Sequence, residues 1–471
     1  MERALRQLRT YEDAVRFLEE ALNYEKTARW QYNKRTLNLG RTRDLLAALG
    51  NPHDRYSIIH VAGTKGKGTT AGAAARLLTW NGHRTGLLTS PHLITHRERA
   101  QIDGRDISEE DFLSGIRAMQ AHVEAERAAE ERTTVRAPTY FEMLTALALH
   151  HFAERGADWA VVEVGLGGRL DSTNVVAPTC CVVTTIGFDH VEKLGDTAEA
   201  IALEKAGIFK QGVPVVLGRQ RYPGALDALR RAAEELDCPR WEVGRELRVS
   251  RAVPLSAPSE RATAPVGWRF SLRTPGNDYE DVFTPLLGRH QIDNLAAAVG
   301  AVEMTAGHSG MELRPERTAA ALADFQVPGR MELLQREPAV VLDVAHTVES
   351  VEALMDALET HFPGRPVRVV FGCSADKNVA GMLAALQGRC VELTATQAKL
   401  PRAMPVPEVV AAARTAGLVP PEGLRSVPDA CEAARGAIER ADATDVICIT
   451  GSFFTAGEIR ERWLEEGAGR A

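Results

Sequence analysis

The segment His60-Val-Ala-Gly-Thr-Lys-Gly-Lys-Gly-Thr-Thr70 places three glycines and two lysines between an apolar run and an alanine-rich run. Glycines let the backbone turn tightly, so that its N–H groups and the positive end of the following helix face an anion. Lys67 would add a charge for phosphates, and Thr69 a hydroxyl for magnesium. The usual G-x-x-x-x-G-K-[ST] pattern is not met, because Val61 replaces its first glycine and Gly68 separates Lys67 from Thr69. We predict a phosphate-binding loop that comprises Gly63, Thr64, Lys65, Gly66, Lys67, Gly68 and Thr69.

Polar residues follow two further apolar runs. Glu163 comes directly after the run 159–162, and Asp189-His190 closely follow the run 181–186. In an open parallel sheet, ligands collect at the carboxyl ends of the strands. Thr69, Glu163 and His190 are therefore expected to form a magnesium shell, since magnesium prefers oxygen ligands and bridges substrate phosphates. His190 taken alone is more typical of an ordinary hydrogen-bonded histidine.

Lys205 lies in a segment that is typical of a helix. The pattern of residues 195–207 predicts a helix capped by Asp196, with Glu199 three residues later, and closed by Gly207. On the sequence alone, Lys205 in the last turn would simply complement the negative end of the helix dipole.

The elements that must position these residues follow from the hydrophobic pattern. Between residues 57 and 218, apolar runs alternate with amphipathic segments, which predicts an α/β fold with a parallel sheet covered on both faces. Residues 241–287 indicate an antiparallel hairpin or small sheet, with a turn at Gly276-Asn277-Asp278. A helix is expected over 291–306, and a break follows near Pro328-Gly329. A second alternation beyond this break predicts a second, smaller doubly wound domain.

Composition bounds the class of protein. The 471 residues are 45% hydrophobic and 25% charged, as in ordinary globular proteins, and no run of about 18 apolar residues could span a membrane. Acidic residues throughout the first 26 positions argue against a signal peptide, so we expect a soluble cytoplasmic protein. The net charge of −7 offers no footprint for nucleic acid. Seven cysteines without C-x-x-C spacing are most simply reduced core residues.

Eight motifs occur in one order along the chain: GTKGKGTT, SPHL with RERAQIDG, EVGLGGRLDSTN, TTIGFDHVEKLGDT, EKAGIFK, GRHQIDN, PGRME and DVAH. In this order they resemble the folylpolyglutamate synthase/dihydrofolate synthase family of the Mur ligase superfamily. The resemblance implies an ATP-dependent amide ligase with a P-loop ATP-binding domain over 1–325. It also implies a Rossmann-like C-terminal glutamate-ligase domain over 326–471, with the active site in the cleft between the two domains.

The resemblance also assigns roles to residues. It implies that Lys205 is carbamylated, which converts a cation into an anion that can bind magnesium beside His190 and Lys67. The residues implied for ATP from the hinge and second domain are Asn294, Arg330, Asp343 and His346, and Gln291 would help shape that pocket. Arg330 could instead be a solvated turn residue, and Asp343 a helix cap. The folate substrate would lie beside Ser90, Pro91 and His92, with Arg97 in the following loop, and glutamate would meet Lys377 and Ser452.

The implied reaction passes through an acyl phosphate, formed from a substrate carboxylate and ATP and then attacked by the amine of glutamate. ATP and Mg²⁺ are the expected cofactors, the partners are small-molecule substrates, and a monomer is expected. Thr347 stands where relatives usually carry Asn, and Asn378 where Asp is common. Another Mur-type ligase with a non-folate acceptor is the alternative enzyme. A nucleotide-dependent switch is the alternative of another class, against which Glu163, His190 and the complete second domain argue.

Overall fold

The computed structural model describes residues 7–25, 27, 30–33, 36–130, 137–309, 312–418 and 420–468. Parts of the N-terminal segment, residues 1–6 and 26, therefore lie outside the described residues. The chain forms two compact units. The first comprises residues 1–250, 272–280 and 293–322, and the second comprises residues 251–271, 281–292 and 323–471.

The first unit is built on an eight-stranded sheet with the order β4-β3-β2-β5-β1-β6-β7-β8. Strands β1, β2, β5, β6, β7 and β8 are parallel, and β3 and β4 add an antiparallel edge. The parallel α/β sheet predicted from the apolar runs is thus confirmed. The strands are β1 (Ser57–Ala62), β2 (Thr85–Leu88), β3 (Ala100–Ile102), β4 (Arg105–Asp106), β5 (Trp159–Glu163), β6 (Cys180–Val183), β7 (Val215–Leu217) and β8 (Arg240–Glu242).

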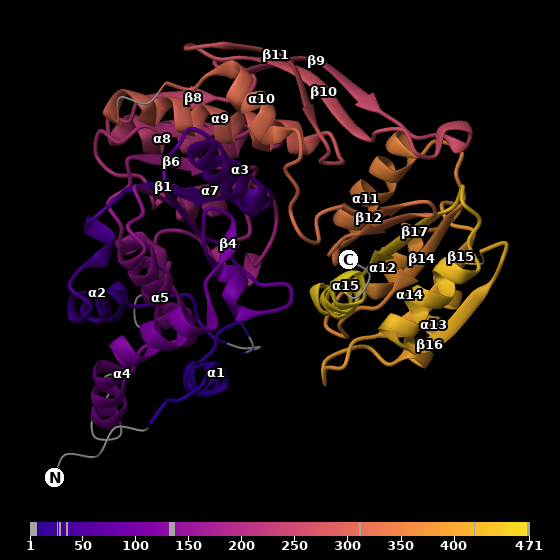
Figure 1. The fold of residues 1–471 in the computed structure, drawn as a ribbon, viewed down its shortest axis with the longest axis horizontal. Coiled ribbons are helices and arrows are strands. Elements are labelled where there is room, and N and C mark those ends of the chain that lie inside the picture. The colour runs from indigo at the N-terminus through magenta and orange to yellow at the C-terminus, as the bar shows by residue number, and fades with distance from the viewer. Residues whose placement is uncertain are drawn as a thin grey trace. The chain divides into compact units, whose positions relative to one another are not determined.

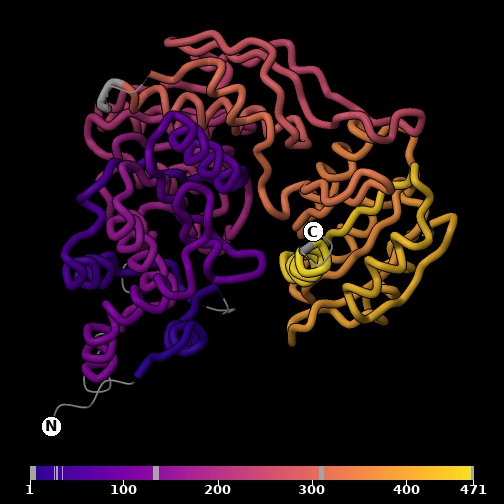
Figure 2. Tube along the Cα trace, viewed as in Figure 1, coloured from indigo at the N-terminus to yellow at the C-terminus, as the bar shows by residue number. Residues whose placement is uncertain are grey.

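Helices cover this sheet. Helix α3, whose alanines and leucines are buried, packs against β1, β2 and β5 (Figure 1). Strands far apart in the sequence, such as β1 and β5, lie side by side. Figure 2 traces the backbone with its colour running along the sequence. The helices are α1 (Tyr11–Glu19), α2 (Leu39–Ala48), α3 (Lys67–Trp80), α4 (Glu109–Glu130), α5 (Tyr140–Glu154), α6 (Val191–Leu194), α7 (Ala198–Ala206), α8 (Pro223–Glu235), α9 (His290–Ser309) and α10 (Pro315–Leu322), with 3-10 turns at Pro52–Asp54, His96–Arg99, Ser172–Val175 and Ser259–Arg261.

A separate three-stranded sheet contains β9 (Arg248–Leu255), β10 (Gly267–Arg273) and β11 (Asp278–Thr284) in the order β11-β10-β9. A tight turn joins β10 to β11, in which the Thr274 N–H donates to the Asn277 carbonyl at 2.9 Å. The predicted hairpin is therefore confirmed. The small sheet begins later than residue 241, because residues 240–242 form β8 at the edge of the large sheet.

The second unit contains a six-stranded sheet with the order β12-β13-β17-β14-β15-β16, in which only β12 is antiparallel to its neighbour. Two of its strands, β12 and β16, were not predicted. Their side chains are mostly polar or exposed, since both strands lie at the edges of the sheet. The elements are β12 (Glu332–Arg336), β13 (Ala339–Leu342), β14 (Val367–Phe371), β15 (Glu392–Gln397), β16 (Leu424–Asp429), β17 (Val446–Thr450), α11 (Val348–His361), α12 (Val379–Ala384), α13 (Val406–Thr415), α14 (Ala430–Glu439) and α15 (Phe453–Ala468).

No helix in the described part of the chain combines the length and the apolar character that crossing a membrane requires.

Thr347 caps helix α11. Its hydroxyl accepts the Ser350 N–H at 3.3 Å, and its own N–H donates to the Ser350 hydroxyl at 2.9 Å. Asn caps helices as well as Thr, whereas Ala cannot accept this bond. We expect Thr347→Asn to leave the free energy of unfolding within about 0.5 kcal/mol of the parent, and Thr347→Ala to lower it by about 1 kcal/mol. Denaturant unfolding measures both, and equal losses for the two variants would contradict the capping role.

Candidate active site

The predicted phosphate loop joins the end of β1 to the start of α3. Gly63 and Gly66 have φ angles of 148° and 89°, which residues with a Cβ atom rarely adopt. A Cβ atom on Gly66 would lie 2.3 Å from Asn294 Oδ1, so the side chain of Asn294 closes over the loop. Lys67 is the first residue of α3, and Thr69 is buried within its first turn. The loop thus presents a helix N-terminus, a lysine and a hydroxyl together.

The loop is fixed to the end of β6. The N–H groups of Thr64 and Lys65 donate to the Thr185 carbonyl at 3.0 and 3.2 Å. The Thr184 hydroxyl donates to the Lys65 carbonyl at 2.8 Å. A Cβ atom on Gly63 would lie only 1.8 Å from Thr184 Oγ1, so glycine is required for this close approach. The conformation of the loop therefore depends on its contact with the neighbouring strand.

Glu163, the last residue of β5, lies beside this loop. Its side chain is 4% exposed, and a Cβ atom on Gly68 would lie 3.7 Å from Glu163 Oε2. The same carboxylate accepts the Ser90 N–H at 3.0 Å. One acidic group thus connects the phosphate loop to the segment predicted for the folate substrate.

His190 follows β6 and has a left-handed backbone with a φ of 52°. Its imidazole is half exposed, and Nε2 lies 3.8 Å from Asp189 Oδ1. The other carboxylate oxygen of Asp189 lies 3.9 Å from Lys65 Nζ. Partial desolvation lowers the pKa of His190, which favours the neutral imidazole that can accept a proton or bind a metal. The Asp189 carboxylate therefore lies close to both His190 and Lys65 of the phosphate loop.

Lys205 is almost fully buried in the last turn of α7, with 4% of its surface exposed. Burial first, and then the charge of Lys67, lower the pKa of its amine to about 7, although Asp189, Asp171 and Glu204 act in the opposite direction. Among the described residues, no hydrogen bond or ion pair holds this amine. A partly neutral, buried lysine amine is a nucleophile at physiological pH.

The cap predicted for α7 is wrong. Thr197, not Asp196, precedes the helix in an extended conformation, and its hydroxyl accepts the Ala200 N–H at 3.1 Å. Both residue types cap helices, so the sequence did not distinguish them. Gly207 does close the helix. It does so with a right-handed backbone, and a Cβ atom there would lie 2.4 Å from Arg169 Cβ.

The segment predicted for the folate substrate contains a cis peptide between Ser90 and Pro91. Arg99, which is 2% exposed, donates its Nε–H to His92 Nδ1 at 2.8 Å. Because a guanidinium only donates, His92 Nδ1 accepts, and the proton of the neutral ring lies on Nε2. Arg97 donates instead to the Ile107 carbonyl at 2.7 Å.

In the second unit, Asp343 is buried directly after β13. Its carboxylate accepts the N–H groups of Met331 at 2.8 Å and Ala345 at 2.7 Å, while burial raises its pKa. It does not cap α11, since Thr347 does. The rings of His346 and Phe453 are 5.6 Å apart, and the Arg330 guanidinium lies 5.3 Å from the Phe453 ring centroid. Phe453 therefore joins two of the residues predicted for ATP.

Lys377 and Ser452 follow the neighbouring parallel strands β14 and β17. Lys377 is exposed, and its Nζ lies 3.6 Å from Asp376 Oδ2. Ser452 is buried, and its hydroxyl accepts the Thr455 N–H at 3.0 Å at the start of α15. These two residues thus lie in segments at the carboxyl ends of neighbouring strands of the second sheet.

The arrangement in the first unit suits phosphate and, with one condition, magnesium. In the described part of the chain, no three His, Cys, Asp or Glu side chains form a metal site. The predicted shell contains only two such residues, Glu163 and His190, together with the Thr69 hydroxyl and Lys205. An ammonium would repel a metal ion, so these residues fit magnesium only if Lys205 carries no positive charge.

Comparison with known proteins agrees with this geometry. Residues 61–302 match the Mur ligase middle domain, and residues 329–453 match the Mur ligase glutamate ligase domain. Dihydrofolate synthase/folylpolyglutamate synthase of Bacillus subtilis is 35% identical over 425 residues, which cover 90% of this chain and 94% of that protein.

Two solved structures are also similar. Folylpolyglutamate synthase (FPGS) of Mycobacterium tuberculosis with ADP superimposes with a TM-score of 0.83 at 31% identity, covering 96% of this chain and 98% of that one. An FPGS–AMPPCP–folate complex gives a TM-score of 0.78 at 30% identity, covering 97% and 100%. Fold and domain matches together define a Mur-type ligase that forms carbon–nitrogen bonds. The chain belongs to the folylpolyglutamate synthase/dihydrofolate synthase family.

Sequence analysis did not single out three residues that contact the predicted site. Arg99 holds His92, Phe453 lies between Arg330 and His346, and Asp171 accepts the Leu166 N–H at 2.8 Å in the segment after β5. Arg99 and Asp171 lie within recognised motifs, and Phe453 directly follows Ser452, but nothing in the local spacing indicates their partners.

Gly66 provides a direct test of the loop. Gly66→Ala would place a methyl group against Asn294, whereas Gly82→Ala, at a φ of 94°, would meet no atom within 4 Å. Both variants strain the backbone by about 1 kcal/mol or more. We expect only Gly66→Ala to weaken ATP binding, on the order of 10-fold or more, as measured by calorimetry. Unchanged affinity in Gly66→Ala would contradict the assignment of this loop.

Proposed function

We propose that the protein is an ATP-dependent ligase that adds L-glutamate to dihydropteroate, to tetrahydrofolate polyglutamates, or to both. The observation that carries this proposal is the glycine-rich loop with Lys67 at the start of α3, close to the buried Lys205. The family relationship supplies the substrates, since a similar FPGS was solved with AMPPCP and folate. We further propose that it acts in the cytoplasm as a monomer.

The first step activates the acceptor. An oxygen of its carboxylate attacks the γ-phosphorus of ATP, the bond to ADP breaks, and an acyl phosphate results. Negative charge spreads over the transferred phosphoryl oxygens in this step, so fixed positive groups accelerate it. Lys67 and the N–H groups of the loop around Gly66 supply those groups. Asn294 lies against the same loop and would fix its position.

In the second step, the glutamate amine attacks the acyl carbon, loses a proton, and phosphate leaves. Arg330, Asp343 and His346 would contact the nucleotide, and Lys377 and Ser452 would position glutamate. His346 Nδ1 lies 2.9 Å from the Val344 carbonyl, which only accepts, so Nδ1 carries the proton and Nε2 of the neutral ring is an acceptor.

Magnesium, when bound, would neutralise phosphate charge. Thr69, Glu163, His190 and a carbamate of Lys205 would hold it. A neutral Lys205 amine adds to carbon dioxide and loses one proton, which gives an anion. Burial and Lys67 leave about half of the amine neutral near pH 7, so the modification needs no separate base to begin.

Product analysis tests the proposed function. The protein is incubated with ATP, magnesium and glutamate, with dihydropteroate and tetrahydrofolate supplied in separate reactions. We expect glutamate-dependent phosphate release and products heavier by one or more glutamyl residues. Phosphate release that does not depend on glutamate, with either acceptor, would contradict the proposal.

Substitution of Lys205 tests the proposed carbamate, because the carbamate is negatively charged whereas a lysine that complements the helix dipole is positively charged. We expect Lys205→Ala to lose activity on the order of 10²-fold and Lys205→Arg to be no better, although arginine keeps the positive charge. Wild-type protein depleted of carbon dioxide should recover activity when bicarbonate is added. Because the neutral fraction of the amine rises as pH increases through about 7, recovery should be more complete at pH 8 than at pH 6.

Lys205→Ala is the matched control, since bicarbonate should leave its activity unchanged at either pH. A fully active Lys205→Arg protein would return this lysine to a structural role at the end of α7.

A further inference from the structure

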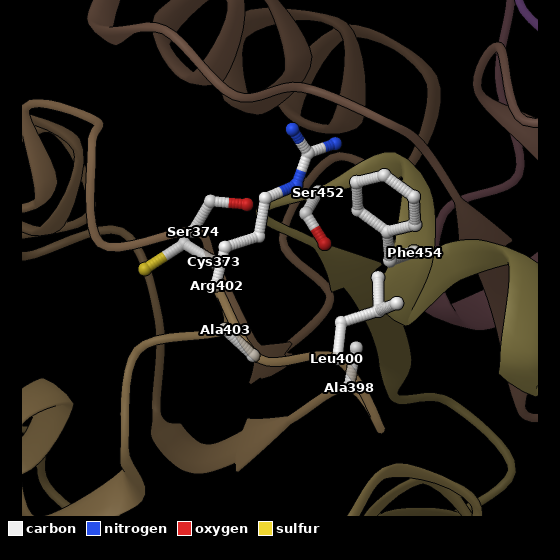
Figure 3. Close-up of a pocket in the computed structure, with 8 residues that line it drawn as sticks. All are labelled: Cys373, Ser374, Ala398, Leu400, Arg402, Ala403, Ser452 and Phe454. Carbon is white, nitrogen blue, oxygen red and sulfur yellow. The ribbon is translucent and has the colours of Figure 1, made fainter. Parts of the chain in front are cut away.

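The pocket in Figure 3 lies in the second unit, where the segments after β14, β15 and β17 meet. The Arg402 Cζ lies 4.5 Å from the centroid of the Phe454 ring there, and the lining side chains leave no room for a water molecule. A space that is filled in this way offers no site for a ligand. The first unit contains a polar network with a more specific consequence, at the point where helix α7 ends beside the segment after β5.

The carboxyl end of α7 packs tightly against the segment that follows β5. A Cβ atom on Gly168 would lie 2.8 Å from the Glu204 carbonyl oxygen and 2.9 Å from the Lys205 carbonyl oxygen. The Arg169 N–H donates to the same Glu204 carbonyl at 2.9 Å. Because Gly168 permits this close approach of two backbones, the backbone that carries Lys205 is held directly by residues 168–169.

The side-chain amide of Asn174 connects these two segments. Its Nδ2 donates to the Arg169 carbonyl at 3.0 Å and to the carbonyl of Gly207, which follows the last residue of α7, at 3.0 Å. The last carbonyls of a helix have no partner within the helix, and Asn174 provides a donor at this helix end. Asn174 is 8% exposed, so water does not readily replace its donors.

Lys210 orients this amide. Its Nζ donates to Asn174 Oδ1 at 2.6 Å. The carbonyls of Arg169 and Gly207 only accept, so the amide nitrogen must face them and the amide oxygen must face Lys210. Both N–H groups and the oxygen of the amide are thus used, and the reversed amide would satisfy none of the three partners.

We propose that Asn174 is a positioning residue for the carbamate of Lys205, and that Lys210 orients Asn174 for this role. The inference rests on the proposed function. In the modification, the Lys205 amine nitrogen forms a bond to the carbon of carbon dioxide and releases one proton. Asn174 takes no part in this step. It holds the backbone at the end of α7 and thereby sets the place where the carbamate forms.

The backbone at this helix end must be held precisely, because lysine has a long and flexible side chain. Groups that orient a metal ligand from behind are worth about 10-fold to 100-fold in metal affinity. Asn174 occupies such a place. It holds Gly207, two residues after Lys205. It also holds Arg169, whose N–H donates to the carbonyl of Glu204, just before Lys205.

Carbon-13 NMR of the full-length protein measures the carbamate without turnover. The protein is equilibrated with ¹³C-labelled bicarbonate and magnesium at one pH, and the signal of interest is the one that the parent gives and Lys205→Ala does not. We expect Asn174→Ala to need on the order of 10-fold more bicarbonate than the parent for half occupancy, because two buried carbonyls lose their donor. Lys210→Met, which removes only the orienting group, should need about 3-fold more.

Asn81→Ala is the matched control. Asn81 follows the last residue of α3, and its Nδ2 donates to the Leu77 carbonyl at 2.7 Å, so it makes the same kind of bond at the end of another helix. This variant should need as much bicarbonate as the parent. Asn174→Asp keeps the pair with Lys210 but cannot donate to the carbonyls, so we expect it to resemble Asn174→Ala.

Equal half-occupancy concentrations in the parent and in Asn174→Ala would overturn the positioning role, because a residue that only stabilises the fold changes the melting temperature and not the bicarbonate requirement. Activity gives a second readout. The deficit of Asn174→Ala should shrink as bicarbonate is raised, and a deficit that bicarbonate does not change would also overturn the role.

A parent without a signal that depends on Lys205 gives a different result. It would contradict the carbamate in the proposed function and overturn this inference with it, whereas equal occupancy in parent and variant overturns the inference alone. Thermal unfolding identifies a misfolded Asn174→Ala protein, in which case Lys210→Met carries the comparison.

Discussion

The burial of Lys205 beside Lys67 is the electrostatic constraint on which the candidate site depends. Removing an ammonium from water is unfavourable, and a second cation nearby adds repulsion, so the pKa of the Lys205 amine falls to about 7. The repulsion between the two cations falls when the Lys205 amine is neutral, when it becomes a carbamate, or when phosphate binds beside them. A carbamate, being an anion, attracts a metal ion, whereas the unmodified ammonium repels one, so a resident metal ion requires a change at Lys205.

Strand order turns this constraint into a site. The parallel strands β5, β1 and β6 are neighbours. The phosphate loop, Glu163 and the Thr184–His190 segment therefore all lie at the carboxyl ends of adjacent strands. Glu163 then reaches both the loop and the Ser90 N–H. The second unit repeats the principle, with Asp343, Lys377 and Ser452 each following a parallel strand. Carboxyl ends of strands thus supply the predicted polar groups of both units.

The sequence predicted those parallel strands that are nearly continuous apolar runs, as in Cys180–Val183. It also predicted the phosphate loop, whose glycines are required by close contacts with Thr184 and Asn294. The edge strands β8, β12 and β16 were missed because a half-exposed edge has no such run.

Side-chain partners could not be predicted at all. The contact of Arg99 with His92, and the place of Phe453 beside Arg330 and His346, depend on how separate segments meet in the folded chain. Local spacing contains no information of this kind. The sequence likewise indicated no role for Thr347, which stands where relatives usually carry Asn, and the structure shows that its side chain caps α11.

The account claims above all that an acceptor carboxylate is activated by direct phosphoryl transfer. Labelling the reacting carboxylate of the acceptor with ¹⁸O and analysing the released phosphate by mass tests this claim. Transfer of one labelled oxygen from each acceptor molecule to phosphate is the predicted result, because the oxygen that attacks phosphorus leaves with it. Phosphate without the label, formed together with glutamylated product, would contradict the acyl-phosphate mechanism and the role given to the phosphate loop.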